Sequence, residues 1–236
     1  MSKPTALKVL IGKVKELGME GAKDPMDRPW KTGMFKEETT EPIWLTKTGL
    51  VGDEVADTKN HGGPEKALFV YPTVHYNYWK EDLGNDSIGI GAMGENIALI
   101  GGDEFTFCIG DTYQLGEAII QVSQPRRPCW KPARRFRTLD LTLRIQNTGR
   151  TGWYFRVLQE GHIQAGDEFI LLERPYPQWT IAASNEVMYV KTDDLRLADE
   201  LASIELLAIN WKRSLFRRLQ GQKEDIKRRV YGPNME

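Results

Sequence analysis

The hydrophobic pattern of this chain changes near residue 178, and this change constrains the fold more than any other feature of the sequence. Before it, short β-branched and aromatic runs alternate with Gly, Pro and Asp, which is typical of strands joined by turns. After the segment RPYPQWT (174–180), apolar residues recur at helical spacing. We therefore expect a mainly β body at 1–178, a barrel or sandwich, followed by a three-helix extension at 179–236.

Several runs in the body have the composition of strands. Residues 152–174 are expected to form a hairpin that turns near Gly161. The predicted strands are KALFVYP (66–72), EFTFCIGDTYQLG (104–116) and AIIQVSQP (118–125).

Capping residues mark the expected helices. One helix is predicted within residues 73–84, with Thr73 as its N-cap and Gly84 at its end. A shorter helix is predicted within residues 137–147. In the extension, Ser184 is predicted to cap the first helix.

Composition excludes several classes of protein. With 40% hydrophobic and 28% charged residues, the chain resembles an ordinary soluble globular protein. Its net charge of -1 gives no signature of nucleic-acid or membrane binding. The N-terminus lacks a long apolar segment, and two cysteines cannot form a disulfide framework. We therefore expect a cytoplasmic protein with neither nucleic-acid nor membrane partners.

The stretch GIGAMG (89–94) satisfies the glycine pattern of a dinucleotide-binding turn. That motif requires a following helix whose N-terminus binds the pyrophosphate. Here ENIALI and then two glycines follow, which leaves room for a short strand but not for a helix. We therefore reject a nicotinamide site.

The two cysteines have contrasting surroundings. Cys108 lies among aromatic residues in a predicted strand, and we expect it to be a small buried residue. Cys129 lies in SQPRRPCWKP, where Arg126, Arg127 and Lys131 favour the thiolate and three prolines stiffen the loop. These residues alone leave open whether Cys129 is a buried structural thiol or a functional one.

The three histidines do not have the spacing of a zinc site. His75 is expected to pack within an aromatic helix or at its surface, and His162 to lie at the surface. His61 precedes Gly62 and Gly63, which would let backbone amides approach a ligand closely. A simple tight turn explains the same glycines.

Cations in loops form a further group of candidates. Lys36 of KTGMFK and Arg150 of NTGRTGWY would create an anion pocket if they converged beside a thiolate. Otherwise they are solvated loop residues. The basic segment 211–229 is interpreted as the solvent-exposed face of a helix, because Glu224 and Asp225 interrupt the run of basic residues.

Five motifs occur in the order found in one family. They are KTGMFK, LVGDEVADTKNHGGPEKALFVYP, GAMGENI, SQPRRPCWKP and GRTGWYFRV. In this order they resemble MOSC domains, modules related to the C-terminal part of molybdenum cofactor sulfurases. The resemblance spans about residues 8–175, and the tail resembles the three-helix extension of the stand-alone bacterial branch called YiiM-like. That branch is linked to resistance to N-hydroxylated purine analogues such as hydroxylaminopurine.

The resemblance implies a MOSC-type β-barrel and a molybdenum cofactor (molybdopterin) whose metal is bound by one protein thiolate, Cys129. We expect no pyridoxal phosphate. His61 is expected to line the pocket, and Asn96 to hydrogen-bond the pterin or the substrate. Cations and backbone amides would bind the cofactor's phosphate. The predicted cofactor-binding residues are Lys36, Gly62, Gly63, Asn96, Arg126, Arg127, Lys131 and Arg150.

The resemblance also implies a molybdenum-dependent oxidoreductase that detoxifies N-hydroxylated purines or amines by reducing N–OH to N–H. Cys129 and His61 are the predicted catalytic residues, with His61 or a water donating one of the protons required. Two other functions stay open. Cys129 could carry persulfide sulfur, or the protein could store or deliver the cofactor without turnover.

The source of electrons requires a partner. An iron–sulfur cluster of the plant ferredoxin type needs four cysteines, and this chain has two. Neither a flavin site nor a nicotinamide site is recognisable in the sequence. We therefore expect a separate flavin or iron–sulfur reductase to supply the electrons.

Overall fold

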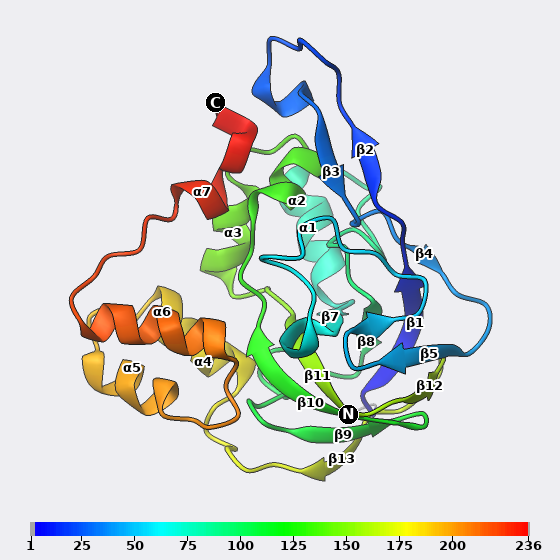
Figure 1. Cartoon of the computed structure of the whole chain (residues 1–236), viewed down its shortest axis with the longest axis vertical. Helices are drawn as coiled ribbons and strands as arrows, with labels where there is room; N and C mark the ends of the chain where they lie inside the picture. The colour runs from blue at the N-terminus through cyan, green and yellow to red at the C-terminus, as the bar shows by residue number, and fades with distance from the viewer. Residues whose placement is uncertain (1–2, 236) are drawn as a thin grey trace.

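A computed structural model describes residues 3–235, and Figure 1 shows the arrangement of its elements. The largest sheet has eight strands in the order β13-β9-β10-β11-β7-β8-β1-β4. Its neighbours pair antiparallel except β7 and β8, which pair parallel. Two smaller sheets have the orders β12-β5-β6 and β2-β3. The strands are β1 (Thr5–Ile11), β2 (Lys15–Leu17), β3 (Trp30–Thr32), β4 (Glu37–Glu38), β5 (Ile43–Thr46), β6 (Gly49–Leu50), β7 (Leu68–Pro72), β8 (Ile97–Ile100), β9 (Thr112–Leu115), β10 (Ala118–Pro125), β11 (Trp153–Gln159), β12 (Gly161–Ile163) and β13 (Ile170–Glu173).

Helices connect these strands and follow them. The α-helices are α1 (His75–Leu83), α2 (Trp130–Arg135), α3 (Leu141–Thr148), α4 (Ile181–Tyr189), α5 (Leu195–Ala202), α6 (Ile209–Leu219) and α7 (Lys227–Val230). Three 3-10 helices are η1 (Pro25–Asp27), η2 (Pro64–Lys66) and η3 (Gly232–Met235). Within the residues that the structure describes, no helix is both long and apolar enough to span a bilayer.

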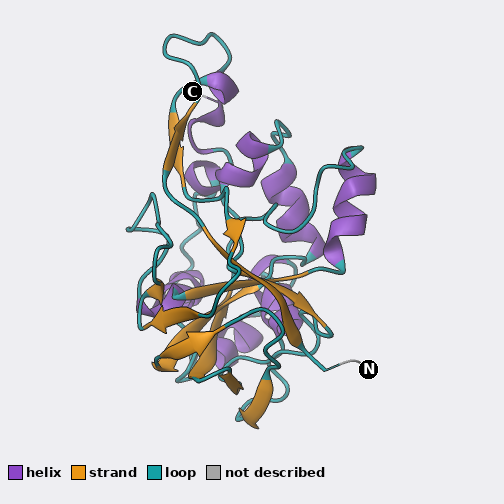
Figure 2. Cartoon of the chain, turned by 90° about the vertical axis from the view of Figure 1, so that its right-hand side faces the viewer, coloured by secondary structure: helices purple, strands orange, loops and turns teal. Residues whose placement is uncertain are grey.

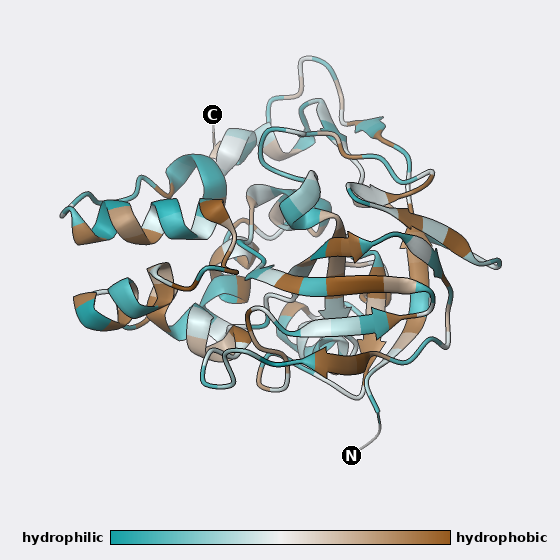
Figure 3. Ribbon diagram, turned by 60° about the horizontal axis from the view of Figure 1, so that its bottom comes forward, coloured by the Kyte–Doolittle hydropathy of each residue, from teal (hydrophilic) through white to brown (hydrophobic). Residues whose placement is uncertain are grey.

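The large sheet curls into a half-barrel, with its strands crossing at different angles in Figure 2. Backbone hydrogen bonds from Ala6 N to Asp167 O and from Phe169 N to Pro4 O, both 2.9 Å, join β1 to the segment before β13. Hydrophobic residues colour much of the sheet brown in Figure 3. The predicted mainly β body followed by helices is confirmed.

The C-terminal helices share the hydrophobic core of the body. Ile181 of α4, Leu201 of α5 and Trp211 of α6 are fully buried and belong to the same apolar cluster as the strands. The sequence predicted these three helices, whereas the short α7 was not predicted. The proposed boundary between residues 178 and 179 stays a prediction, because a shared core does not define where one unit ends.

Two predicted helix caps are wrong. Thr180, not Ser184, caps α4, since its side chain accepts a hydrogen bond from Ala183 N at 3.0 Å. At α1, the Thr73 hydroxyl donates to Leu99 O at 3.0 Å and the helix begins one residue beyond Val74. Both predicted capping hydroxyls donate to carbonyls instead: Thr73 to Leu99 O, and Ser184 Oγ to Thr180 O at 2.9 Å. Gly84 ends α1 in the left-handed conformation, as predicted.

Two strand predictions also need correction. Residues 152–174 do not form a hairpin, because β12 pairs with β5 while β11 pairs with β10 and β7. Within residues 104–116 only β9 is a strand. The preceding residues form a turn in which Asp111 Oδ2 accepts from Cys108 N at 2.9 Å. Cys108 is buried there, as expected.

Candidate functional site

The loop that carries Cys129 joins β10 to α2. Arg126 N still donates to Gly152 O, beside β11, at 3.0 Å. Pro128 then lacks the amide donor that would extend this ladder. Cys129 is extended, and its carbonyl accepts a hydrogen bond from Thr142 Oγ1 of the next helix at 2.9 Å. The loop therefore leaves the sheet after Arg126, and helix α3 holds its backbone at Cys129.

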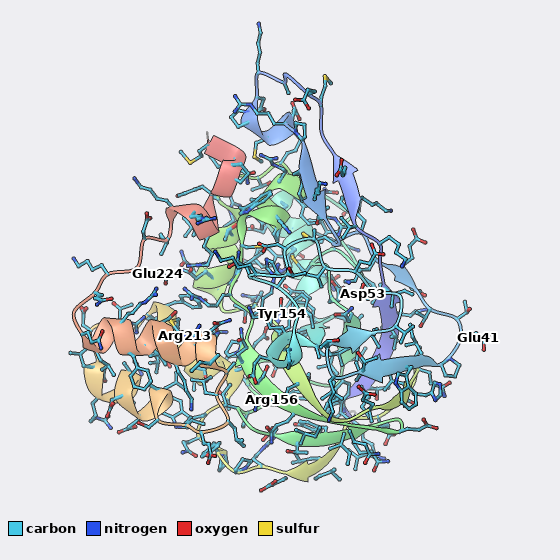
Figure 4. The ribbon with its side chains drawn as sticks, in the orientation of Figure 1. Glu41, Asp53, Tyr154, Arg156, Arg213 and Glu224 are labelled. Atoms are coloured by element: carbon cyan, nitrogen blue, oxygen red, sulfur yellow. The ribbon has the colours of Figure 1, made fainter. Side chains whose placement is uncertain are left out.

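A pocket adjoins this loop, and its wall comes from segments that are far apart in the sequence. Figure 4 labels two wall residues, Asp53 from the loop after β6 and Tyr154 from β11. Neither was singled out by the sequence. The predicted residues that line the pocket are Lys36, His61, Gly62, Asn96, Arg126, Cys129 and Lys131.

The Cys129 thiol is acidic for a buried cysteine. Burial alone would raise its pKa, but the nearby His61, a hydrogen bond from that imidazole, Arg126 and the Lys131 amide together outweigh burial. The result is a pKa of about 6, so the thiolate predominates at neutral pH. Of the cations that the sequence predicted to favour the thiolate, Arg126 acts through its charge and Lys131 through its backbone amide, whereas the effect of His61 on this thiol was not predicted. In contrast, burial and Asp111 raise the pKa of the Cys108 thiol to about 11.

Arg126 is a buried cation with spare hydrogen-bonding capacity. Its residue is 3% exposed, and its guanidinium lies 5.0 Å from the centroid of the Phe69 ring. Its Nη1 has no hydrogen-bond partner among residues 3–235. Burial raises the pKa of the adjacent Tyr154 hydroxyl to about 12, although Arg126 opposes this through its charge and a hydrogen bond. A buried donor left in this state favours an anionic ligand.

A second polar group lies elsewhere in the pocket wall. Asp53 accepts hydrogen bonds from Lys36 Nζ, from Gly12 N at 2.8 Å and from Asn96 Nδ2 at 2.8 Å. Burial lowers the pKa of Lys36, and its neighbours Asp53 and Glu95 counteract this. Asn96 also accepts a hydrogen bond from Phe69 N at 3.1 Å, so its amide holds Asp53 in the pocket wall.

Two lysines complete the cationic part of the wall. Lys131, two residues after Cys129, is buried and lines the pocket. Lys66 also lines it, and burial together with Arg127 lowers its pKa, while Asp57 and Cys129 raise it. Sequence reasoning overlooked Lys66, although it belongs to the motif that contains His61.

Three predicted residues do not line the pocket. Gly63 follows Gly62 and precedes helix η2 with a φ of 82°. The Arg127 guanidinium instead binds Ser214 Oγ at 2.8 Å and the carboxylate of Glu224. The Arg150 guanidinium lies 3.9 Å from the Tyr78 ring centroid.

The other two histidines lie away from the pocket. His75 is buried and its Nε2 lies 2.7 Å from Glu104 Oε2. His162 is exposed in β12 beside Glu117, as the sequence predicted for a surface position. Within the described part of the chain, no group of three or more His, Cys, Asp or Glu is placed to hold a metal ion. Cys129 is therefore considered as a single ligand.

These residues fit a molybdenum–pterin cofactor. The Cys129 thiolate is a soft ligand, which suits a metal that already carries two dithiolene sulfurs. The unpartnered Arg126 Nη1 and the neighbouring lysines suit a phosphate. The donor set could thus hold such a group through one metal ligand and several anion contacts.

Two family patterns match this chain. The MOSC domain pattern matches residues 57–170. The pattern of the YiiM-like, 3-alpha helix domain matches residues 179–222. The first match contains His61, Asn96, Arg126 and Cys129, whereas Lys36 lies before it.

Individual proteins show the same likeness. Protein YiiM of Escherichia coli is 37% identical over 204 residues, which cover 85% of this chain and 91% of that protein. Its crystal structure superposes with a TM-score of 0.79 at 29% identity, covering 98% of this chain and all of that one. YiiM from Geobacillus stearothermophilus superposes with a TM-score of 0.75 at 33% identity, covering 92% and 99%. A protein of Gibberella moniliformis named "Reductase" is 34% identical over 85% of this chain, which spans only 35% of that protein.

Proposed function

We propose that this chain, which belongs to the MOSC family and to its YiiM-like branch, binds a molybdenum cofactor through Cys129 and reduces N-hydroxylated compounds. Family membership supports the cofactor, and the fungal relative named "Reductase" supports a redox role. The observation that carries the proposal is an acidic thiol, Cys129, in one pocket with the unpartnered donor of Arg126.

The chain's own residues would hold the cofactor through two kinds of contact. Cys129 would bind the metal through sulfur. Arg126, Lys131 and Lys66 would bind the phosphate, because they are the wall cations near the thiol. Lys36 is neutralised by Asp53, so we assign it to the pocket's shape and field rather than to a direct phosphate contact.

The reaction requires electrons and protons. When bound, the cofactor supplies the two-electron chemistry that converts an N–OH group to N–H and water. His61 would hold a proton at its imidazole and keep it within the pocket through its hydrogen bond to Cys129. Phe69 and Met93 present apolar surface to the same pocket and would exclude water around a flat heterocycle.

The substrate class that we propose is an N-hydroxylated purine such as hydroxylaminopurine, or a related amine. The test uses protein made in a host that synthesises the molybdenum cofactor. Bound molybdenum and pterin are measured first, and hydroxylaminopurine is then offered with reduced viologen dye. We expect about one molybdenum per chain and formation of the N–H product, because the proposal gives the chain one metal ligand.

Other outcomes separate the remaining functions. Bound cofactor without any N–OH reduction would replace the enzyme proposal with storage or delivery. Protein without molybdenum that carries a persulfide on Cys129 would favour sulfur transfer. Absence of both from protein with an intact fold would contradict the proposed site itself.

A further inference from the structure

The Cys129 loop takes hydrogen bonds from the C-terminal region. Pro125 ends β10 and Pro128 lacks an amide donor, so the chain beyond β10 does not continue the strand and its carbonyls need donors from elsewhere. Trp211 Nε1 donates to Pro125 O at 3.0 Å. Arg229 Nη1, from α7, donates to Pro128 O at 2.8 Å. Two carbonyls on the approach to Cys129, those of Pro125 and Pro128, therefore accept from residues more than eighty positions later in the chain.

Arg229 ties this loop to a second element. Its Nη2 donates to Gln146 Oε1 of α3 at 2.9 Å while its Nη1 holds Pro128. The same helix holds Cys129 itself, since Thr142 Oγ1 donates to the Cys129 carbonyl at 2.9 Å. The Arg229 side chain is only 16% exposed. Its planar guanidinium thus joins the loop and α3 in a fixed geometry.

The C-terminal residues also hold the segment that follows Cys129 in the sequence. Asn234, 4% exposed, donates from Nδ2 to Trp130 O at 3.2 Å. Its Oδ1 accepts from Arg134 Nε of α2 at 2.7 Å. Gly232 packs so closely on the Trp130 indole that a Cβ there would lie 2.3 Å from the ring. Figure 1 shows α7 and the C-terminus beside α2 and α3.

We propose that α7 and η3 form a C-terminal clamp (residues 227–235) that positions Cys129. Arg229 fixes the residue before the cysteine and Asn234 fixes the residue after it, so the thiol cannot turn away from the pocket wall. Arg229 and Asn234 are positioning residues, because they act through the loop and line no part of the pocket. The clamp lies beyond the family match at 179–222, so family membership does not assign it.

The test measures how accessible Cys129 becomes when the clamp is loosened. Cofactor-free protein is alkylated with iodoacetamide at a pH well above the pKa of Cys129, so that the rate reports access and not ionisation. Arg229→Ala should raise the Cys129 rate about tenfold to a hundredfold, the range for losing hydrogen bonds from a charged donor. Arg229→Lys should raise it less, because one donor can still reach Pro128 O.

Arg228→Ala is the matched control. Arg228 is the exposed neighbour in the same helix, and its side chain makes no hydrogen bond or ion pair among residues 3–235. Its substitution should leave the Cys129 rate unchanged. Cys108 reports global unfolding, because it is buried away from the clamp. Asn234→Ala gives an independent variant, and it should accelerate amide hydrogen exchange at residues 129–131.

The outcomes are distinct. A Cys129 rate that rises in Arg229→Ala while the Cys108 rate stays constant supports the clamp. A wild-type Cys129 rate in Arg229→Ala together with wild-type amide exchange at residues 129–131 in Asn234→Ala, or equal acceleration of both cysteines, overturns it. The role of Cys129 as a metal ligand rests on the proposed function, but this assay contains no molybdenum. Failure of the cofactor proposal would therefore leave the clamp measurement unaffected, and the reverse also holds.

Discussion

The acidity of Cys129 depends on a histidine from a different loop. The neighbouring cations in the sequence explain only part of it, because burial alone would raise the pKa of this thiol. His61 provides both charge interaction and a hydrogen bond. At the scale of single residues, the site is therefore a thiol–imidazole pair supported by Arg126.

A titration tests this pair. In cofactor-free protein, the ultraviolet absorbance of thiolate should rise with a half-point near pH 6, the pKa of Cys129. The Cys108 thiol stays protonated there because its pKa is about 11. The depressed pKa means that the thiolate is lost as pH falls through about 6. His61→Gln should move the half-point upward, and an unchanged half-point would contradict the assigned cause.

The spare donor of Arg126 makes a second prediction. Arg126→Ala should weaken retention of the cofactor by about one to two decades, as expected for a charge-assisted contact of roughly 1.5–3 kcal/mol. Pterin released on gel filtration measures the effect. Arg150→Ala is the control, since Arg150 lies over Tyr78 outside the pocket wall. Equal losses from the two variants would place the phosphate elsewhere.

Among the elements, the junction of β10 and β11 fixes where the Cys129 loop leaves the sheet. Gly152 accepts from Arg126 N and adopts a φ of 65°. A Cβ there would lie 2.4 Å from Val70 O, whereas a Cβ at Gly149, with a φ of 69°, would meet nothing within 4 Å. Space as well as conformation therefore requires glycine at position 152.

This pair of glycines allows a matched stability test. Gly149→Ala should lower the free energy of unfolding by about 1–2 kcal/mol, the cost of a left-handed conformation. Gly152→Ala adds a backbone clash and should cost about 1–3 kcal/mol more. Denaturant unfolding compares the two variants. If Gly152→Ala is no more destabilised than Gly149→Ala, the junction is looser than the structure indicates.

The sequence pattern correctly predicted those helices and strands that are determined by their own residues. The run Leu68–Pro72 is a strand and Gly84 ends a helix, because apolar composition and a left-handed glycine act locally. The expected hairpin at 152–174 failed because pairing is a long-range property, and β12 joins β5 instead. Helix α2 was missed because Pro132 lies inside it.

The site residues show the same contrast between local and long-range determinants. The surroundings of Cys129 made it a candidate, and the family resemblance assigned it and Arg126 to the cofactor site. Arg127 has the same local surroundings but turns to Ser214 and Glu224, and nothing local distinguishes the two arginines. Asp53 and Tyr154 join the pocket only through folding. Both residues belong to motifs that carry the family resemblance, and this membership is the only indication of a role that the sequence contains.

For the whole molecule, the source of electrons gives a prediction. We propose that a separate flavin or iron–sulfur reductase supplies them, because the chain has two cysteines and GIGAMG leads into strand β8, not a helix. Molybdenum-loaded protein should reduce hydroxylaminopurine with reduced viologen but not with NADPH alone. A soluble reductase fraction should restore the NADPH reaction. Steady turnover with NADPH and this chain alone would contradict the prediction.

The central claim is that one thiolate holds the metal. The matched pair Cys129→Ser and Cys108→Ser tests it, because both residues are buried but only Cys129 lines the pocket. A serine hydroxyl is a harder and far less acidic ligand than a thiol, so it should not replace Cys129.

The decisive measurement is the molybdenum content per chain of these two variants and the wild type, all purified from the same cofactor-producing host. The account predicts that Cys108→Ser retains the wild-type content and that Cys129→Ser loses it while remaining folded. Equal molybdenum content in Cys129→Ser and in the wild type would contradict the account.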